Sequence, residues 1–207
     1  MITIKNIKTI EGMVITHTIP SERDQTLDAE GRLTILPALI DPHVHFRTPG
    51  AEHKEDWKTG AQAAIAGGVT TVFDMPNNTP SCCNKELLLN KIRLIDSQLN
   101  EIKIPLRYHL YFGAHQDYLE EIPAVKDLVI GIKVFMGSST GDLIMENDAA
   151  LERVFQLAAQ LNMIVSVHAE DEKMLKKRHA KFGTQTDPAV HSKIRDREVA
   201  ISATAKA

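Results

Sequence analysis

Two histidines separated by a single residue follow an apolar run near the start of the chain. The stretch DPHVHFR spans residues 41–47 and comes directly after the apolar residues 33–40. Alternate side chains of an extended strand share a face, so His43 and His45 point the same way and can coordinate one metal ion. Arg47 continues that face. The pattern predicts a metal site beside a pocket for an anionic substrate, and chance histidines at a strand end are the alternative.

A lysine lies inside another apolar segment, GIKVFM at residues 131–136. Burial of an unpartnered ammonium is costly, so Lys133 is expected to reach outward, to lose its charge or to be modified. A neutral lysine amine can add carbon dioxide, and the resulting carbamate has two oxygens that could bridge two divalent cations. A salt bridge at the strand end is the alternative for Lys133.

A third imidazole follows a further apolar strand. His168 is a natural metal ligand there, and a core histidine bonded to the backbone is the alternative. Metal-bound histidines usually need an acceptor for the second ring nitrogen, which Glu170 or Asp171 could supply. His109 and His115 are weaker candidates, because we expect His109 to be a satisfied core histidine and His115 to lie in a loop.

A proline-flanked turn, DMPNNTP at residues 74–80, follows the second predicted strand. The prolines fix a turn that would present Asn77 at the strand end. An amide there suits a substrate with carbonyl and carboxylate groups. A turn asparagine that stabilises its own backbone is the alternative.

Five apolar segments rich in β-branched residues alternate with segments of helical period, which indicates a parallel sheet. The predicted strands are residues 36–45, 69–75, 107–113, 129–136 and 163–168. Helices are predicted between them, at residues 57–65, 88–99 and 151–161. Gly67 is expected to end the first helix, and Asn147 or Asp148 to cap the third.

The polar residues named above cluster at the ends of these strands, where the active site of a (β/α) barrel lies. An open doubly wound sheet is the competing architecture. No Gly-x-Gly-x-x-Gly follows the first strand, and the glycine-rich residues 137–141 lack the lysine of a phosphate loop. The sequence therefore favours about five βα units of a TIM-like barrel over residues 37–207, with a small β appendage over residues 1–36.

The net charge, the apolar runs and the cysteines of the chain disfavour several classes of protein. A formal net charge of -3 and the absence of a long basic block disfavour a nucleic-acid binder, and residues 176–178 are expected to be a solvated helix face. No apolar run suits a membrane span or a secretory signal, which makes the cytoplasm the expected compartment. The adjacent Cys82 and Cys83 are expected to be reduced packing residues.

Four motifs occur in order along the chain: HVHFRTPG at 43–50, DMPNNT at 74–79, KVFMGSSTG at 133–141 and HAED at 168–171. Together they resemble the dihydroorotase family, in the cyclic amidohydrolase branch of the amidohydrolase superfamily. The resemblance implies a distorted (β/α)8 barrel with two zinc ions. It also implies reversible interconversion of dihydroorotate and N-carbamoyl-aspartate in pyrimidine biosynthesis, and a homodimer would be unsurprising.

The resemblance also implies roles for particular residues. His43 and His45 are implied as ligands of the first zinc. Carboxylated Lys133 is implied as the bridge between the ions, and His168 as a ligand of the second. Imidazole and carbamate also accept cobalt, manganese or iron, so the sequence leaves the metal open.

Arg47 and Asn77 are implied as the groups that bind the substrate carboxylate. Hydantoinases and dihydropyrimidinases resemble the chain around the metal, but their usual substrates lack this carboxylate and they typically lack an arginine at this point. Allantoinase is a more distant alternative. A noncatalytic dihydroorotase-like scaffold is an alternative of another class, and the retained metal ligands argue against it.

The chain also departs from the family pattern. The family barrel has a further zinc-binding histidine after its sixth strand and a catalytic aspartate after its eighth, and Ala207 falls before both. His191 and Asp196 lie in a polar, helix-like tail and do not replace these groups. The appended β-sandwich of the family would be completed by residues from the far end of the chain. We therefore predict no general base within the 207 residues, and no activity for this polypeptide alone.

Overall fold

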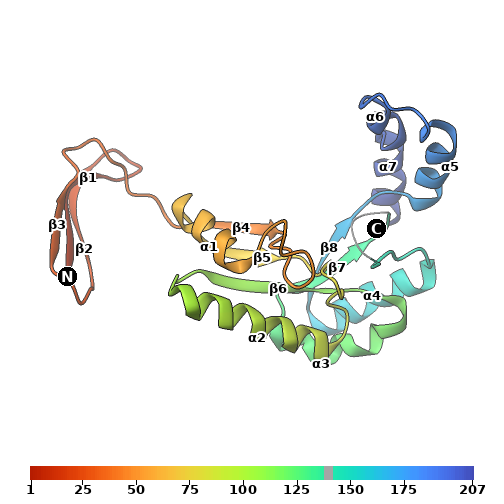
Figure 1. The fold of residues 1–207 in the computed structure, drawn as a ribbon, viewed down its shortest axis with the longest axis horizontal. Coiled ribbons are helices and arrows are strands. Elements are labelled where there is room, and N and C mark those ends of the chain that lie inside the picture. The colour runs from red at the N-terminus through yellow and green to blue at the C-terminus, as the bar shows by residue number, and fades with distance from the viewer. Residues whose placement is uncertain (138–141) are drawn as a thin grey trace. The chain divides into compact units, whose positions relative to one another are not determined.

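The computed structural model describes residues 1–137 and 142–207, and the chain forms two compact units, Met1–Leu39 and Ile40–Ala207. The first unit is a three-stranded sheet of order β2-β1-β3 (Figure 1). Its strands are β1 (Ile2–Lys8), β2 (Val14–Ile19) and β3 (Gln25–Asp28). β1 pairs antiparallel with β2 and parallel with β3. Membership of this unit in a composite β-sandwich stays a prediction.

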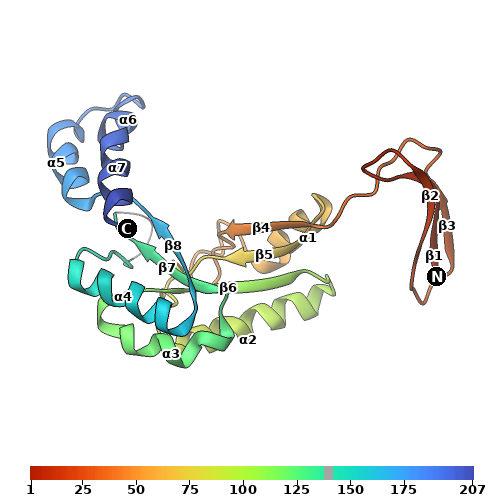
Figure 2. The ribbon, with the colours of Figure 1, turned by 180° about the vertical axis from the view of Figure 1, so that it is seen from behind.

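The second unit is built on a five-stranded sheet whose strands follow one another in chain order (Figure 2). They are β4 (Leu39–Val44), β5 (Val69–Asp74), β6 (Arg107–Gly113), β7 (Gly131–Phe135) and β8 (Ile164–His168). β5 to β8 pair in parallel. Because every crossover steps in the same direction, the sheet curls as part of a (β/α) barrel, whereas a doubly wound sheet would reverse its order. The barrel prediction is confirmed, with strand ends up to three residues from those expected.

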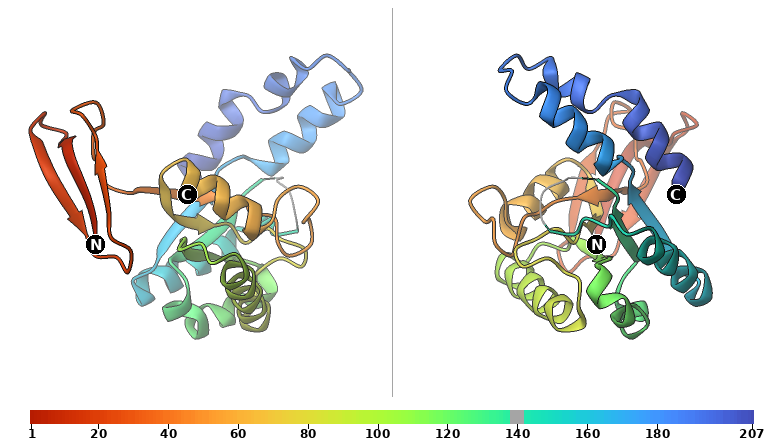
Figure 3. Two further views of the ribbon diagram at one scale, coloured as in Figure 1. Left: turned by 60° about the vertical axis from the view of Figure 1, so that its left-hand side comes forward. Right: turned by 90° about the vertical axis from the view of Figure 1, so that its right-hand side faces the viewer.

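Helices follow the strands in the second unit (Figure 3). They are α1 (Trp57–Ala66), α2 (Lys85–Ile102), α3 (Ile122–Val125), α4 (Asp148–Leu161), α5 (Glu172–Phe182), α6 (Val190–Ile194) and α7 (Arg197–Lys206), with 3-10 turns at Gln116–Glu121 and Lys126–Leu128. The predicted caps are present: the Asn147 side chain accepts from two backbone N–H groups of α4, and Gly67 ends α1. Asp56 and Asn84 cap α1 and α2 in the same way.

One face of the sheet packs against helices and forms the core. Val72, Leu110, Ile132 and Val134 alternate along their strands and are at most 1% exposed. Residues of opposite parity lie on the other face, and these include His43, Lys133 and His168. His109 lies on this face as well: it is exposed, and its ring meets the edge of Phe73 at 5.3 Å between centroids. The expectation of a satisfied core histidine is wrong, because His109 points away from the helix-covered face.

Helices α5 to α7 close on a small core of their own, centred on Leu175 and Val199. Asp171 joins this group to the strand end: its carboxylate accepts from Met174 N at 2.9 Å and from the Ser202 hydroxyl at 2.7 Å. The expected solvated face over residues 176–178 is partly wrong, since Arg178 is half-buried against Asp196 at 2.7 Å.

Cys82 and Cys83 are free thiols, as expected, and both are buried. Burial raises the pKa of Cys82 to about 11, so this thiol stays protonated at neutral pH. Among the residues that the structure describes, no helix is long and apolar enough to cross a membrane.

Candidate metal and anion site

His43 and His45 lie side by side at the end of β4, as the strand period predicts. Their ring centroids are 5.3 Å apart, and the rings are tilted by 49°. Desolvation lowers the pKa of both imidazoles. Nearby positive charge lowers each pKa further: Lys133 and His168 act on His43, and Arg47 acts on His45. Both imidazoles are therefore held in the neutral form, which is the form that binds metals.

Lys133 lies in the middle of β7, a strand in which every residue is buried. Its side chain is 2% exposed, and its Nζ is 5.1 Å from the centroid of the Phe135 ring. Desolvation lowers the pKa of the amine. Lys133 forms no salt bridge with any residue of 1–137 or 142–207. The expected burial is confirmed, and a buried amine of lowered pKa has the character that carbamate formation requires.

His168 ends β8, directly beside the end of β7. Phe135 and His168 are paired in the sheet register, and their ring centroids are 6.0 Å apart. His168 Nε2 lies 2.7 Å from Glu170 Oε2, and Arg195 forms an ion pair with the same carboxylate oxygen. Asp171 caps α5 instead, so Glu170 is the acceptor that orients the ring. Because Glu170 holds Nε2, Nδ1 is the ring nitrogen through which His168 could bind a metal.

Arg47 and Asn77 come from the loops that follow β4 and β5. Arg47 has a left-handed backbone with φ of 62°, a costly conformation for a residue with a side chain. Asn77 is 8% exposed, and its side chain interacts with that of His45, which favours the protonated form and so acts to raise the pKa of that imidazole. The two loops touch, since Thr79 N donates to Pro49 O at 3.1 Å. The loop contact thus brings both predicted carboxylate-binding groups to the histidine pair.

The side chains of the candidate site suit a divalent cation only if Lys133 is one of the metal ligands. The described residues contain no group of three or more His, Cys, Asp or Glu side chains able to hold a metal ion. The candidate set instead combines neutral imidazoles from β4 and β8 with the buried amine of β7. Conversion of Lys133 to an anionic carbamate would supply the oxygen ligands and negative charge that this set otherwise lacks.

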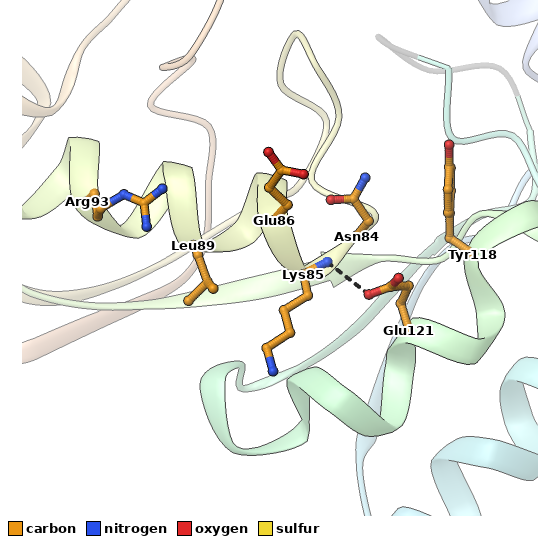
Figure 4. A pocket seen from close by; sticks show the side chains of 7 residues that line it. All are labelled: Asn84, Lys85, Glu86, Leu89, Arg93, Tyr118 and Glu121. Atoms are coloured by element: carbon orange, nitrogen blue, oxygen red, sulfur yellow. Dashed lines mark hydrogen bonds between the residues drawn. The ribbon is translucent and has the colours of Figure 1, made fainter.

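Some residues considered in the sequence analysis lie away from the candidate site or outside the part of the chain that the structure describes. His115 lies in a loop, as expected, and accepts a hydrogen bond from Asp117 N at 3.3 Å. Residues 138–141 of the third motif fall outside the part of the chain that the structure describes. A pocket of about 560 Å³ at the start of α2 is lined by none of the predicted site residues (Figure 4).

Comparisons with known proteins show the family of the chain. The family described as "Amidohydrolase family" matches residues 34–197, which include all four strand-end positions of the candidate site. The chain belongs to the amidohydrolase family. Among curated amidohydrolases, a dihydroorotase of Methanosarcina acetivorans is 35% identical over 180 residues, which are 84% of this chain and 36% of that protein. A dihydroorotase of Halobacterium salinarum is 38% identical over 148 residues, which are 70% of this chain and 33% of that protein.

Solved amidohydrolase structures share the fold. The L-hydantoinase (dihydropyrimidinase) of Arthrobacter aurescens superposes with a TM-score of 0.82 at 21% identity, over 99% of this chain and 49% of that one. A D-hydantoinase gives a TM-score of 0.75 at 25% identity, over 99% and 48%. The chain therefore spans about a third of the length of its curated relatives and about half of these solved chains.

One charged residue near the candidate site was missed by sequence reasoning. Lys91 of α2 is 2% exposed and lies 2.6 Å from Asp74, whose carboxylate is fully buried. A signal was present, because Lys91 falls at helical spacing within the apolar stripe that contains Leu88 and Ile95. A lysine on the buried face of a helix implies an acidic or carbonyl partner beneath it.

Proposed function

We propose that the chain carries the metal-binding and carboxylate-binding part of a dihydroorotase, which interconverts dihydroorotate and N-carbamoyl-aspartate in pyrimidine biosynthesis. The observation that carries this proposal is Arg47 beside His45, in a loop held against the loop of Asn77. A cyclic amide that also bears a carboxylate needs a cation next to the metal site, and Arg47 is that cation. The dihydroorotases among the relatives, at 30–38% identity, support the same substrate class.

Each group of the site has a distinct task in this proposal. Arg47 would form a bidentate pair with the substrate carboxylate, and Asn77 would add a hydrogen bond that fixes its orientation. His43, His45 and His168 would bind the metal ions as neutral imidazoles, the form that desolvation favours in the first two. Two bound zinc ions would polarise the ring carbonyl and lower the pKa of a water molecule.

The metal bridge in this proposal is carboxylated Lys133. The carbamate would form at an amine whose charge is already disfavoured by burial, and it would persist while metal binds its oxygens. We propose zinc as the metal, the cytoplasm as the compartment and a homodimer as the assembly of the whole protein.

Hydantoinase activity is the second candidate, and the hydantoinase structures of the same fold are the observation in its favour. A binding comparison separates the two functions. We expect the zinc-loaded chain to bind dihydroorotate at least about tenfold more tightly than dihydrouracil or hydantoin, which lack the carboxylate. Equal or weaker binding of dihydroorotate in a calorimetric titration would favour the hydantoinase alternative.

A further inference from the structure

The side chain of Lys91 is buried beside the loops that follow β4 and β5. It projects from the apolar face of α2 and is 2% exposed. Its Nζ lies 2.6 Å from Asp74 Oδ2, 2.6 Å from Asn78 Oδ1 and 3.0 Å from Met75 O. Asn78 Oδ1 and Met75 O accept hydrogen bonds from Nζ, and the Asp74 carboxylate forms an ion pair with it. All three partners belong to the segment that ends β5 and forms the Asn77 loop.

The Asp74 carboxylate extends this network to the neighbouring strand. Its Oδ1 accepts a hydrogen bond from Phe46 N at 2.8 Å, in a fully buried setting. Phe46 stands between the metal-site histidine His45 and the left-handed Arg47. The charge on Lys91 is therefore linked, through one carboxylate, to the backbone that sets the direction of the Arg47 side chain.

Backbone contacts make the two loops a single structural unit. Met75 N donates to Val44 O at 3.0 Å, and Thr79 N donates to Pro49 O at 3.1 Å. Gly50 approaches Thr79 so closely that an added Cβ would lie 2.2 Å from the Thr79 carbonyl oxygen. A shift of either loop would therefore move the other, and the Lys91 side chain ties the pair to α2.

Stability alone does not account for this network. Replacement of a buried ion pair by apolar side chains of similar volume is often neutral or stabilising, because both charges lose their hydration on burial. A buried ammonium held by an ion pair and two hydrogen bonds does, however, favour one geometry and penalise alternatives. The geometry fixed here is that of the two loops.

We propose that Lys91 is a positioning residue that holds residues 46–50 and 75–80 so that Arg47 and Asn77 meet the same substrate carboxylate. Lys91 itself touches no substrate. The inference rests on the proposed function for the identity of the ligand. The anchoring of the loops is a property of the chain with no ligand bound, and it can be measured separately.

Amide hydrogen exchange, followed by NMR on the ligand-free chain, tests the anchoring. In Lys91→Met we expect the amides of Phe46 and Thr79 to exchange about tenfold faster or more, because their acceptors are no longer held in place. The amide of Ala114, which donates to Lys133 O at 2.9 Å, serves as an internal reference and should keep its rate. Lys85→Met, at an exposed position of the same helix, is the matched control and should leave all three rates unchanged.

A double variant that removes both buried charges provides a test in case Lys91→Met alone fails to fold. Lys91→Met alone leaves a buried carboxylate unpaired, whereas Lys91→Met/Asp74→Asn removes both charges and keeps an Oδ1 acceptor for Phe46 N. We expect the double variant to keep the circular dichroism spectrum of the parent and to bind dihydroorotate about tenfold more weakly. Parental affinity in the folded double variant would overturn the proposal.

Amide exchange and ligand binding together distinguish failure of this inference from failure of the proposed function. A parent chain that binds neither dihydroorotate nor N-carbamoyl-aspartate contradicts the proposed function, and the exchange rates then decide the anchoring. Parental protection of the Phe46 and Thr79 amides in Lys91→Met overturns the positioning role, whatever the chain binds.

Discussion

At the scale of single residues, the proposed carboxylate-binding role depends on the guanidinium of Arg47. Its backbone conformation, with φ of 62°, is unfavourable for arginine and is maintained by the contacts of the surrounding loop. Its charge lies close enough to His45 to lower the pKa of that imidazole. One residue therefore supplies positive charge for an anion and favours the metal-binding form of its neighbour.

Substitution of Arg47 tests this role. We expect Arg47→Gln to weaken dihydroorotate binding by about 10- to 100-fold, since one charge-assisted contact is lost. Arg47→Lys should recover only part of the loss, because an ammonium cannot form the bidentate pair. Isothermal titration calorimetry measures both, with the exposed Arg93→Gln as control. Parental affinity in Arg47→Gln would show that the carboxylate is bound elsewhere.

Some site residues could be predicted from local sequence and others could not. The strand period is enough to place His43 and His45 on one face, and an apolar run is enough to predict burial of Lys133. The choice of Glu170 over Asp171 as the partner of His168 depends on α7, whose Ser202 engages Asp171. A contact between segments that are distant in sequence leaves no pattern in either segment. The sequence alone therefore does not decide which acidic residue is the partner of His168.

At the scale of elements, the sheet was predictable because its strands are apolar on the helix-covered face and differ sharply from the segments between them. Differences occur at strand ends, where β4 begins at Leu39 and not at residue 36. Residues 33–35 instead exchange backbone hydrogen bonds with Lys8 of β1, and no pattern within the apolar run predicts this change of partner. The contact between the loop of Gly50 and the loop of Thr79 likewise could not be predicted from periodicity.

Two glycines with positive φ permit a matched test of the loop contact. Gly50 (φ 98°) would place a Cβ 2.2 Å from Thr79 O, whereas Gly68 (φ 83°) has nothing within 4 Å. Both alanine variants share the backbone penalty, but only Gly50→Ala adds a clash. We expect Gly50→Ala to lower the free energy of unfolding by about 1–3 kcal/mol more than Gly68→Ala. Equal losses in urea denaturation would contradict the loop packing described here.

At the scale of the whole molecule, the chain consists of two compact units joined near residue 39. Leu39 and Ile40, at this junction, are 51% and 61% exposed. Exposed junctions between compact units are preferred sites of proteolysis. We expect thermolysin to cut first before Leu39 or Ile40 and to leave residues 40–207 largely resistant, as judged by mass spectrometry. A first cut within 57–135 would contradict the division.

We propose that the ends of β4, β7 and β8 assemble a metal site, and the zinc content per chain tests this most directly. Elemental analysis would be made on protein prepared with zinc and bicarbonate. We expect the parent chain and the His109→Ala/His115→Ala control to retain zinc, and His43→Ala/His45→Ala to lose it. Equal zinc in all three proteins, or none in the parent, would contradict the assignment of these strand ends to a metal site.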